Sequence, residues 1–184
     1  LKISYINEIA NLCEVLGADV HDVANAMGKD GRISEKFLHP GPGFGGSCFP
    51  KDLEALLSIS KNNSLSMETV NAAIIVNKNQ KKRMENKLIN LFDGNINNRK
   101  IAVLGLAFKA NTDDVRESPA IDIIKGILGN GGIVNAHDPI ANNEMSKIFH
   151  DIEYFDNVYD AVKNTDGIVI MTEWNEFRSL DLQK

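Results

Sequence analysis

The feature that most constrains the fold is a change of pattern at the turn cluster DGNINNR, residues 93–99. After this cluster, short apolar runs alternate with segments of helical period. Such alternation implies right-handed crossovers and a parallel sheet. One strand is expected to end at Gly105, and others are expected at 133–139, at 152–156 and, buried, at 167–173. The expected helices are 118–129, with Ser118 as the N-cap, 142–149 and 157–165.

Before the turn cluster, the pattern is helical. Expected helices cover 1–17, with Gly17 as the C-terminal stop, and 19–28, with Asp19 as the N-cap. Two more are expected at 52–60 and in a long stretch that opens at Ser64 or Ser66 and runs to 92, with a loop at 29–50. NKNQKK, residues 77–82, is polar on every face of the long helix, which predicts a solvated segment or a bridge between domains. The fold class is therefore an all-α domain, 1–94, followed by a Rossmann-like α/β domain, 98–184, that is incomplete at its C-terminus.

Composition excludes several classes of function. The net charge of −5 disfavours a nucleic-acid or membrane-surface partner, and no apolar run is long enough to span a bilayer. The chain has two cysteines and four histidines, and none of them has the spacing of metal ligands, so no metal is expected. Two cysteines in different settings are not a disulfide framework, which makes a reducing cytoplasm the default location.

The loop GPGFGGSCFPKD, residues 41–52, contains the pattern G-x-G-x-x-G. A dinucleotide fingerprint needs a strand before the glycines and a helix directly after them, and the preceding ISEKFLHP is too polar for a strand, so we reject that interpretation. The glycines instead permit positive φ and a close approach of a ligand to the backbone. Exposed N–H groups in such a loop also favour anions.

Cys48 ends this loop just before a predicted helix that contains Lys51 and Asp52. A helix N-terminus and a nearby ammonium both favour a thiolate, the nucleophilic form of cysteine. The alternative is that Cys48 is a small buried residue in a tight turn, and both interpretations stay open on the sequence. Cys13 lies on the apolar face of a predicted helix and is expected in the core.

These residues carry a resemblance to a known family. GPGFGGSCFPKD, INEIANLCEVLGADVHDV and IAVLGLAFKANTDDVRESPA resemble the active-site loop, the central domain and the C-terminal domain of the UDP-glucose/GDP-mannose dehydrogenase family. The resemblance implies oxidation of a nucleotide-sugar alcohol to a carboxylate with two NAD and one water. Within the family, the sequence of this loop is most similar to that of the enzymes that act on UDP-glucose. The family's N-terminal NAD-binding domain is absent from the sequence, so a truncated, inactive fragment is expected.

The resemblance also assigns roles to particular residues. Cys48 is the implied nucleophile and Asp52 the acidic group that handles water or a proton. Lys51 and Arg116 are the implied NAD contacts. The implied substrate contacts are Arg32, Phe37, Leu38, His39, Pro40, Gly41, Phe44, Gly45, Phe108 and Lys109. Because Arg32 matches a residue that reaches the substrate of a neighbouring subunit, a homodimer built on the helical domain is expected.

Phe108 and Lys109 fit this assignment independently, since ligands bind outside the carboxyl ends of parallel strands. Several alternatives remain. Phe37 and Phe44 can be packing residues, Arg32 a solvated charge, and Arg116 a partner of nearby acidic groups. The substrate can be GDP-mannose or a UDP-N-acetylhexosamine instead of UDP-glucose. The chain can also be a non-catalytic module for nucleotide-sugar binding or dimerisation.

Overall fold

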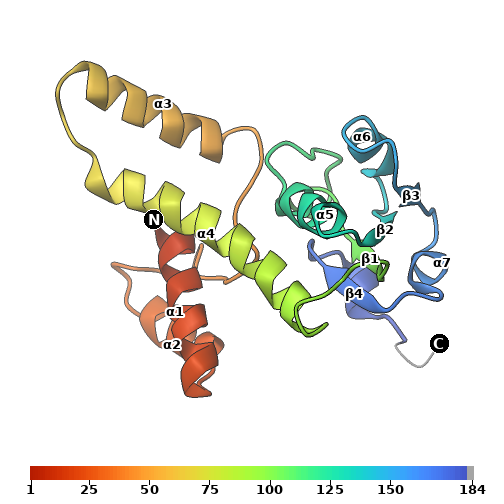
Figure 1. Ribbon diagram of the computed structural model, residues 1–184. Helices are drawn as coiled ribbons and strands as arrows, with labels where there is room; N and C mark the ends of the chain where they lie inside the picture. The colour runs from red at the N-terminus through yellow and green to blue at the C-terminus, as the bar shows by residue number, and fades with distance from the viewer. Residues whose placement is uncertain (182–184) are drawn as a thin grey trace. The chain divides into compact units, whose positions relative to one another are not determined.

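The computed structural model describes residues 1–181 of the chain (Figure 1). It divides into two compact units. Unit 1 consists of Leu1–Phe44 and Cys48–Lys81, and unit 2 consists of Gly45–Ser47 and the chain from Lys82 onward. Three residues of the cysteine loop therefore belong to the second unit, although the residues on both sides of them belong to the first.

Unit 1 is all-helical, as expected (Figure 1). Helix α1, Lys2–Leu16, ends at Gly17, whose φ of +68° is the left-handed conformation that glycine adopts without strain. Helix α2, Val20–Gly28, begins after Asp19, whose carboxylate accepts the His21 N–H. A small apolar core of Ile6, Ala24 and Leu38 lies in this unit.

Helix α3, Phe49–Asn62, begins three residues earlier than the predicted start at Asp52. Pro50 fits the first turn, because the backbone N–H that proline lacks has no partner there anyway. Helix α4, Glu68–Asn90, runs from unit 1 into unit 2.

Along the chain, the division between the two units falls between Lys81 and Lys82, inside α4. The turn cluster that we chose as the boundary begins at residue 93. The reason is the packing of the last turns of α4, where Met84, Leu88 and Ile89 join the core of unit 2. Hydrophobic contact rather than turn composition sets where the unit begins.

Unit 2 is built on a parallel four-stranded sheet of order β3-β2-β1-β4 (Figure 1). The strands are β1 Lys100–Leu104, β2 Ile133–His137, β3 Glu153–Tyr154 and β4 Gly167–Ile170. The helices are α5 Pro119–Gly129, α6 Asn142–Ser146, α7 Val158–Val162 and α8 Asn175–Arg178. Ser118 caps α5 by accepting the Ala120 N–H, as the sequence predicts.

The central strand β1 is buried on both faces, as expected of a parallel strand covered by helices. Its alternate residues enter two different cores. Ile101 and Val103 pack with Ile124 and other α5 residues on one face. Ala102 and Leu104 lie on the other face, in a cluster with residues of α7 and α8.

Two expectations for unit 2 were wrong. Strand β4 is not fully buried, because within residues 1–181 it pairs only with β1 and leaves Ile168 and Ile170 about half exposed at 44% and 50%. Helix α6 is shorter than predicted and ends at Ser146. The sequence also gave no signal for α8, since this four-residue helix has neither a capping side chain nor an apolar period.

The buried face of α5 supplies a test of this core. Ile124→Ala removes a fully buried side chain and should lower the free energy of unfolding by about 2–5 kcal/mol. Ile168→Ala, at a half-exposed position in the same unit, is the matched control and should cost less than about 1 kcal/mol. Urea unfolding measures both, and equal costs would contradict the assigned core.

Candidate active site

The cysteine loop turns twice through conformations that favour glycine. Gly43 has φ +117° and Gly46 has φ +91°, both in the region where a side chain is strained. The G-x-G-x-x-G pattern therefore serves the turns of a loop, and no strand precedes it in the structure. The rejection of a dinucleotide fingerprint at this position agrees with the geometry.

The middle of the loop lies close against residues 108–118 of unit 2. The Gly46 N–H donates a hydrogen bond of 2.8 Å to the Arg116 carbonyl oxygen. A Cβ atom at Gly45 would stand 2.2 Å from the Glu117 carbonyl oxygen, and one at Gly46 would stand 2.9 Å from the Phe108 ring. Only glycine fits at either position, so the two glycines allow this close approach.

Cys48 is exposed and occupies the N-cap position of the 14-residue helix α3. The interpretation of Cys48 as a buried turn residue is therefore wrong, whereas Cys13 is buried in unit 1 as predicted. The Asp52 N–H donates to the Cys48 carbonyl oxygen at 2.9 Å, which closes the first helical turn. The Asp52 carboxylate lies 3.4 Å from the Lys51 ammonium, and both side chains are mostly exposed.

Beside the loop, unit 1 contains a cleft of about 480 Å³. Four predicted substrate contacts line it, namely Phe37, His39, Gly41 and Phe44. The Phe49 ring stands edge-on to the Phe37 ring, with 6.2 Å between the centroids, and is tilted against the Phe44 ring at 6.0 Å. The cleft therefore has an aromatic wall suited to a flat or apolar ligand face.

Two predicted substrate contacts, Leu38 and Pro40, do not line the cleft. The Leu38 side chain is buried in the core of unit 1, so only its backbone can face a ligand. Pro40 is partly buried and does not line the cleft.

Phe108 and Lys109 follow the carboxyl end of β1, the ligand-bearing end of a parallel sheet. The Phe108 N–H donates to the Asp114 carbonyl oxygen at 3.0 Å, which restrains the backbone of this segment. The Lys109 ammonium stands over this ring, 5.3 Å from its centroid. The segment thus presents one aromatic face and one cation side by side.

Both predicted ligand-binding arginines are paired with an aspartate two residues earlier in the chain. Arg116 makes two hydrogen bonds of 2.8 and 2.9 Å to Asp114, and Arg32 makes a 2.6 Å ion pair with Asp30. The Arg116 guanidinium lowers the pKa of Asp114 below its usual value, and Arg32 does the same for the pKa of Asp30. Each pair is present at neutral pH and is lost as the pH falls through the lowered aspartate pKa.

Asp138 directly follows the carboxyl end of β2 and was not among the predicted site residues. It is 2% exposed, and its Oδ2 accepts the Leu106 and Ala107 N–H groups at 2.7 and 3.2 Å. The same oxygen accepts the Trp174 indole N–H at 3.1 Å, and Oδ1 accepts two further N–H groups of the turn after β2. One carboxylate therefore joins the carboxyl ends of three strands, next to Phe108.

The sequence also missed a set of carboxamides. Asn7, Asn77 and Gln80 are buried, and all three bond to the backbone of the cysteine loop. NKNQKK was predicted to be solvated or to bridge two domains. Solvation was wrong at Asn77 and Gln80, whereas α4 does pass from unit 1 to unit 2 within this segment. The positions of Asn77 and Gln80 continue a buried stripe through Val70 and Ala73 of α4, and this spacing is the signal that could have identified them.

Within residues 1–181, no group of histidine, cysteine and acidic side chains has the geometry of a metal site. No described helix is long and apolar enough to cross a membrane. Lys51 and Arg116 are the two residues that were predicted to contact NAD. Lys51 is exposed, and Arg116 is paired with Asp114. No glycine-rich turn leads directly from β1 into α5, so these residues do not form a dinucleotide cradle by themselves.

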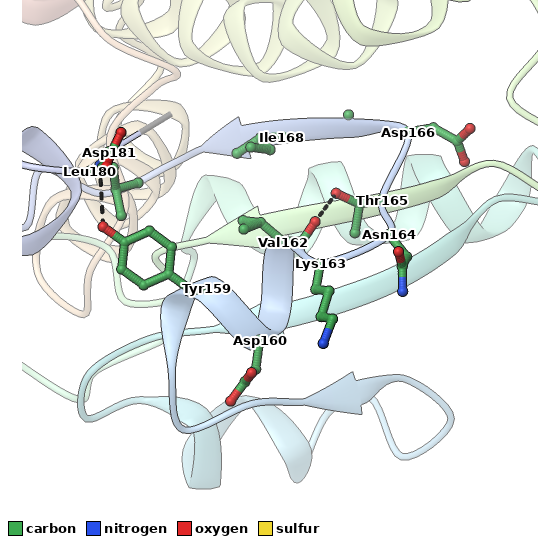
Figure 2. Close-up of a pocket in the computed structure, with 11 residues that line it drawn as sticks. Tyr159, Asp160, Val162, Lys163, Asn164, Thr165, Asp166, Ile168, Leu180 and Asp181 are labelled. Carbon is green, nitrogen blue, oxygen red and sulfur yellow. Dashed lines mark hydrogen bonds between the residues drawn. The ribbon is translucent and has the colours of Figure 1, made fainter. Parts of the chain in front are cut away.

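A larger cavity, of about 770 Å³, lies elsewhere in unit 2, between α7 and β4 (Figure 2). Tyr159, Ile168 and Leu180 form its apolar part, and the Tyr159 hydroxyl accepts the Asp181 N–H. None of the predicted site residues lines it. It reaches Gly167 at the amino end of β4, which is opposite to the ligand-bearing end of the sheet.

Two family models match the chain, and both describe parts of nucleotide-sugar dehydrogenases. Residues 1–79 match the central domain of the UDP-glucose/GDP-mannose dehydrogenase family, and residues 102–184 match that family's UDP binding domain. The chain therefore belongs to the UDP-glucose/GDP-mannose dehydrogenase family, as the resemblance implied.

Individual relatives support this family assignment. The chain is 46% identical to a UDP-glucose 6-dehydrogenase of Rhizobium meliloti and 48% identical to the UDP-glucose 6-dehydrogenase TuaD of Bacillus subtilis. Each alignment covers 100% of this chain, but only 42% and 40% of those relatives. A solved UDP-glucose dehydrogenase from Pyrobaculum islandicum aligns with a TM-score of 0.92 at 36% identity, over 98% of this chain and 42% of that one. The fold class is thereby confirmed.

The close approach at Gly45 predicts a specific sensitivity. Gly45→Ala forces a methyl group against the Glu117 backbone and should destabilise the chain by about 1–3 kcal/mol. Gly31→Ala is the control, because nothing lies within 4 Å of a Cβ at that position. Urea unfolding compares the two variants. A Gly45 variant as stable as the Gly31 variant would contradict the close packing of the loop.

The carboxylate of Asp138 gives a second test. Asp138→Asn places an N–H donor against backbone and indole donors, and should cost about 2–3 kcal/mol of unfolding free energy. Asp151→Asn makes the same chemical change at an exposed position and should cost almost nothing. Thermal unfolding in the two variants measures the difference, and a stable Asp138 variant would refute the role of the carboxylate.

Proposed function

We propose that this chain supplies the nucleophilic cysteine and the UDP-binding domain of an NAD-dependent dehydrogenase that oxidises UDP-glucose to UDP-glucuronate. The observation that carries the proposal is the exposure of Cys48 at the start of α3. A module that only binds a nucleotide sugar has no need of an accessible thiol at a helix N-terminus. Membership of the family and the names of the relatives support the choice of substrate class.

The chemistry explains why a thiol is needed. Removal of one hydride and the hydroxyl proton turns the sugar's primary alcohol into an aldehyde. The Cys48 thiolate then adds to the carbonyl carbon, which forms a C–S bond, and protonation of the carbonyl oxygen completes a thiohemiacetal. Loss of a second hydride and the hydroxyl proton gives a thioester, and water hydrolyses it to the carboxylate and releases the thiol. Two NAD molecules accept the two hydrides when bound.

Asp52 is proposed to handle water or a proton in this sequence of steps. It lies four residues after Cys48, so the two side chains leave the same side of α3 one turn apart. A carboxylate one helical turn after the thiol is suited to orient the water that attacks the thioester.

The remaining predicted residues are proposed as binding groups. Phe37 and Phe44 form the wall of the cleft in unit 1, and Lys109 provides a point charge for a diphosphate or sugar hydroxyls. His39, Pro40, Gly41 and Gly45, with the backbone of Leu38, are proposed to line the path of the substrate. Lys51 and Arg116 are proposed as NAD contacts.

A homodimer through the helical unit is also part of the proposal, with Arg32 reaching the partner's substrate. Its guanidinium pairs with the neighbouring carboxylate of Asp30, and its side chain is 89% exposed. Tyr5, Leu12 and Val15 on α1 are large apolar side chains that are about half or more exposed, which suits an interface. We propose the cytoplasm as the location, since the two cysteines are thiols.

The reactivity of Cys48 tests the nucleophile. Iodoacetamide should alkylate Cys48 at pH 7 about fivefold or more faster than it alkylates free cysteine, because a helix N-terminus favours the reactive form. Peptide mass spectrometry separates Cys48 from buried Cys13, which is the internal control. In the complete polypeptide, Cys48→Ser should reduce oxidation of UDP-glucose by about 10³-fold.

Two outcomes would count against the proposal. Alkylation of Cys48 no faster than free cysteine would favour the non-catalytic module. Faster oxidation of GDP-mannose or a UDP-N-acetylhexosamine than of UDP-glucose would assign a different substrate to the same cysteine.

A further inference from the structure

The backbone of the cysteine loop has few partners of its own kind. Residues 41–47 lie outside any helix or strand, yet Gly45 is buried and Gly41 and Phe44 are only partly exposed. Backbone N–H and C=O groups away from water need hydrogen-bond partners. At Gly41 and Phe44 these partners are side-chain carboxamides from two helices.

Asn77 of α4 binds Phe44 as a second peptide would. Its Oδ1 accepts the Phe44 N–H at 2.8 Å, and its Nδ2 donates to the Phe44 carbonyl oxygen at 3.0 Å. Asn77 is 8% exposed, so these bonds form away from bulk water. Both backbone groups of Phe44 are thereby satisfied by one side chain.

Gly41 is held in the same way, but by two helices. The Asn7 Oδ1 atom on α1 accepts the Gly41 N–H at 2.8 Å. The Gln80 Nε2 group on α4 donates to the Gly41 carbonyl oxygen at 2.9 Å. Asn11, one turn after Asn7, donates to the Gln80 Oε1 atom at 2.9 Å and so fixes the orientation of the Gln80 amide.

Gly43 lies between these two anchor points and allows the loop to approach α4. A Cβ atom there would stand 3.1 Å from the Asn77 Oδ1 atom and 3.0 Å from Lys81 Cγ, at a φ of +117°. A side chain at this position would push the loop away from the carboxamides. The glycine and the carboxamides therefore belong to one arrangement.

We propose that Asn7, Asn11, Asn77 and Gln80 form a carboxamide clamp, a set of positioning residues that holds residues 41–44 in the shape that recognises the nucleotide sugar. This inference rests on the proposed function. Gly41, Gly43 and Phe44 line the cleft, and the clamp fixes their backbone from the helical side. A loop that is ordered on folding does not have to be ordered again when the ligand binds, which raises affinity.

The choice of carboxamides has a chemical reason. A carboxamide offers one donor and one acceptor, which matches the two groups of a peptide. It carries no charge, so the clamp works at every pH at which the chain is folded. It also adds no charge to the cleft.

The variant Asn77→Asp tests the clamp. It keeps the acceptor for the Phe44 N–H but replaces the donor with a second carboxylate oxygen that faces the Phe44 carbonyl oxygen. Asn79→Asp is the matched control, because it adds the same charge two residues away on an exposed part of α4. Gln80→Glu is a second variant, which removes the donor to Gly41.

Isothermal titration with UDP-glucose and with UDP gives the readout. Asn77→Asp should weaken UDP-glucose binding about tenfold or more, equivalent to about 1.4 kcal/mol, while UDP binding changes less than about twofold. Gln80→Glu should show the same split, and Asn79→Asp should leave both affinities unchanged. Equal loss of both ligands, or no loss in either clamp variant, would overturn the inference.

Amide hydrogen exchange tests the clamp without any ligand. The Gly41 and Phe44 amides should exchange slowly in the unmodified chain and about tenfold or more faster in Asn77→Asp or Gln80→Glu. If the unmodified chain binds no UDP-glucose but shows this change in exchange, the proposed function fails and the clamp stands as a structural feature. Unchanged exchange in both variants overturns the clamp itself.

Discussion

The geometry of the candidate site depends on how an irregular loop is kept in one shape. Residues 41–47 have no strand or helix to satisfy their backbone, and three other sources do so. Carboxamides hold Gly41 and Phe44, the Arg116 carbonyl group holds Gly46, and α3 begins directly afterwards. Cys48 follows this restrained path directly, at the start of α3.

In unit 2, buried side chains likewise restrain an irregular segment at the carboxyl edge of the sheet. The chain after β1 must leave the sheet and still present Phe108 and Lys109 in a fixed place. Asp138 binds the backbone of the two residues before Phe108, and the Thr172 hydroxyl donates to the Ala107 carbonyl oxygen at 2.6 Å. Buried polar side chains thus order both segments that carry proposed ligand contacts. In both places a few internal hydrogen bonds determine where exposed functional groups lie.

The sequence predicted features whose signals are local. Gly17 ends α1, Asp19 caps α2 and Ser118 caps α5, because each of these acts on residues within one turn of itself. The loop before α3 and the parallel sheet were also predicted, from the glycine-rich composition of the loop and from the alternation of strands and helices.

What the sequence could not predict involves partners that are distant in the chain. Asn77 and Asp138 look like surface residues because they are polar, and their backbone partners lie more than 30 residues away. The half-exposed strand β4 was missed for a similar reason, since burial of a strand depends on its neighbours in the sheet and its own residues do not determine it. The predicted contact at Leu38 illustrates the same limit, because its side chain joins a core that the loop sequence does not reveal.

The central claim is that the sulfur of Cys48 bonds to the substrate carbon during turnover. Rapid acid quenching of the complete polypeptide with UDP-glucose and NAD, followed by peptide mass spectrometry, measures this directly. The account predicts a transient thioester adduct on the peptide that contains Cys48, with the mass of the uridine-diphosphate hexuronyl group. Formation of UDP-glucuronate at full rate without any adduct on Cys48, or with the adduct on another residue, would contradict it.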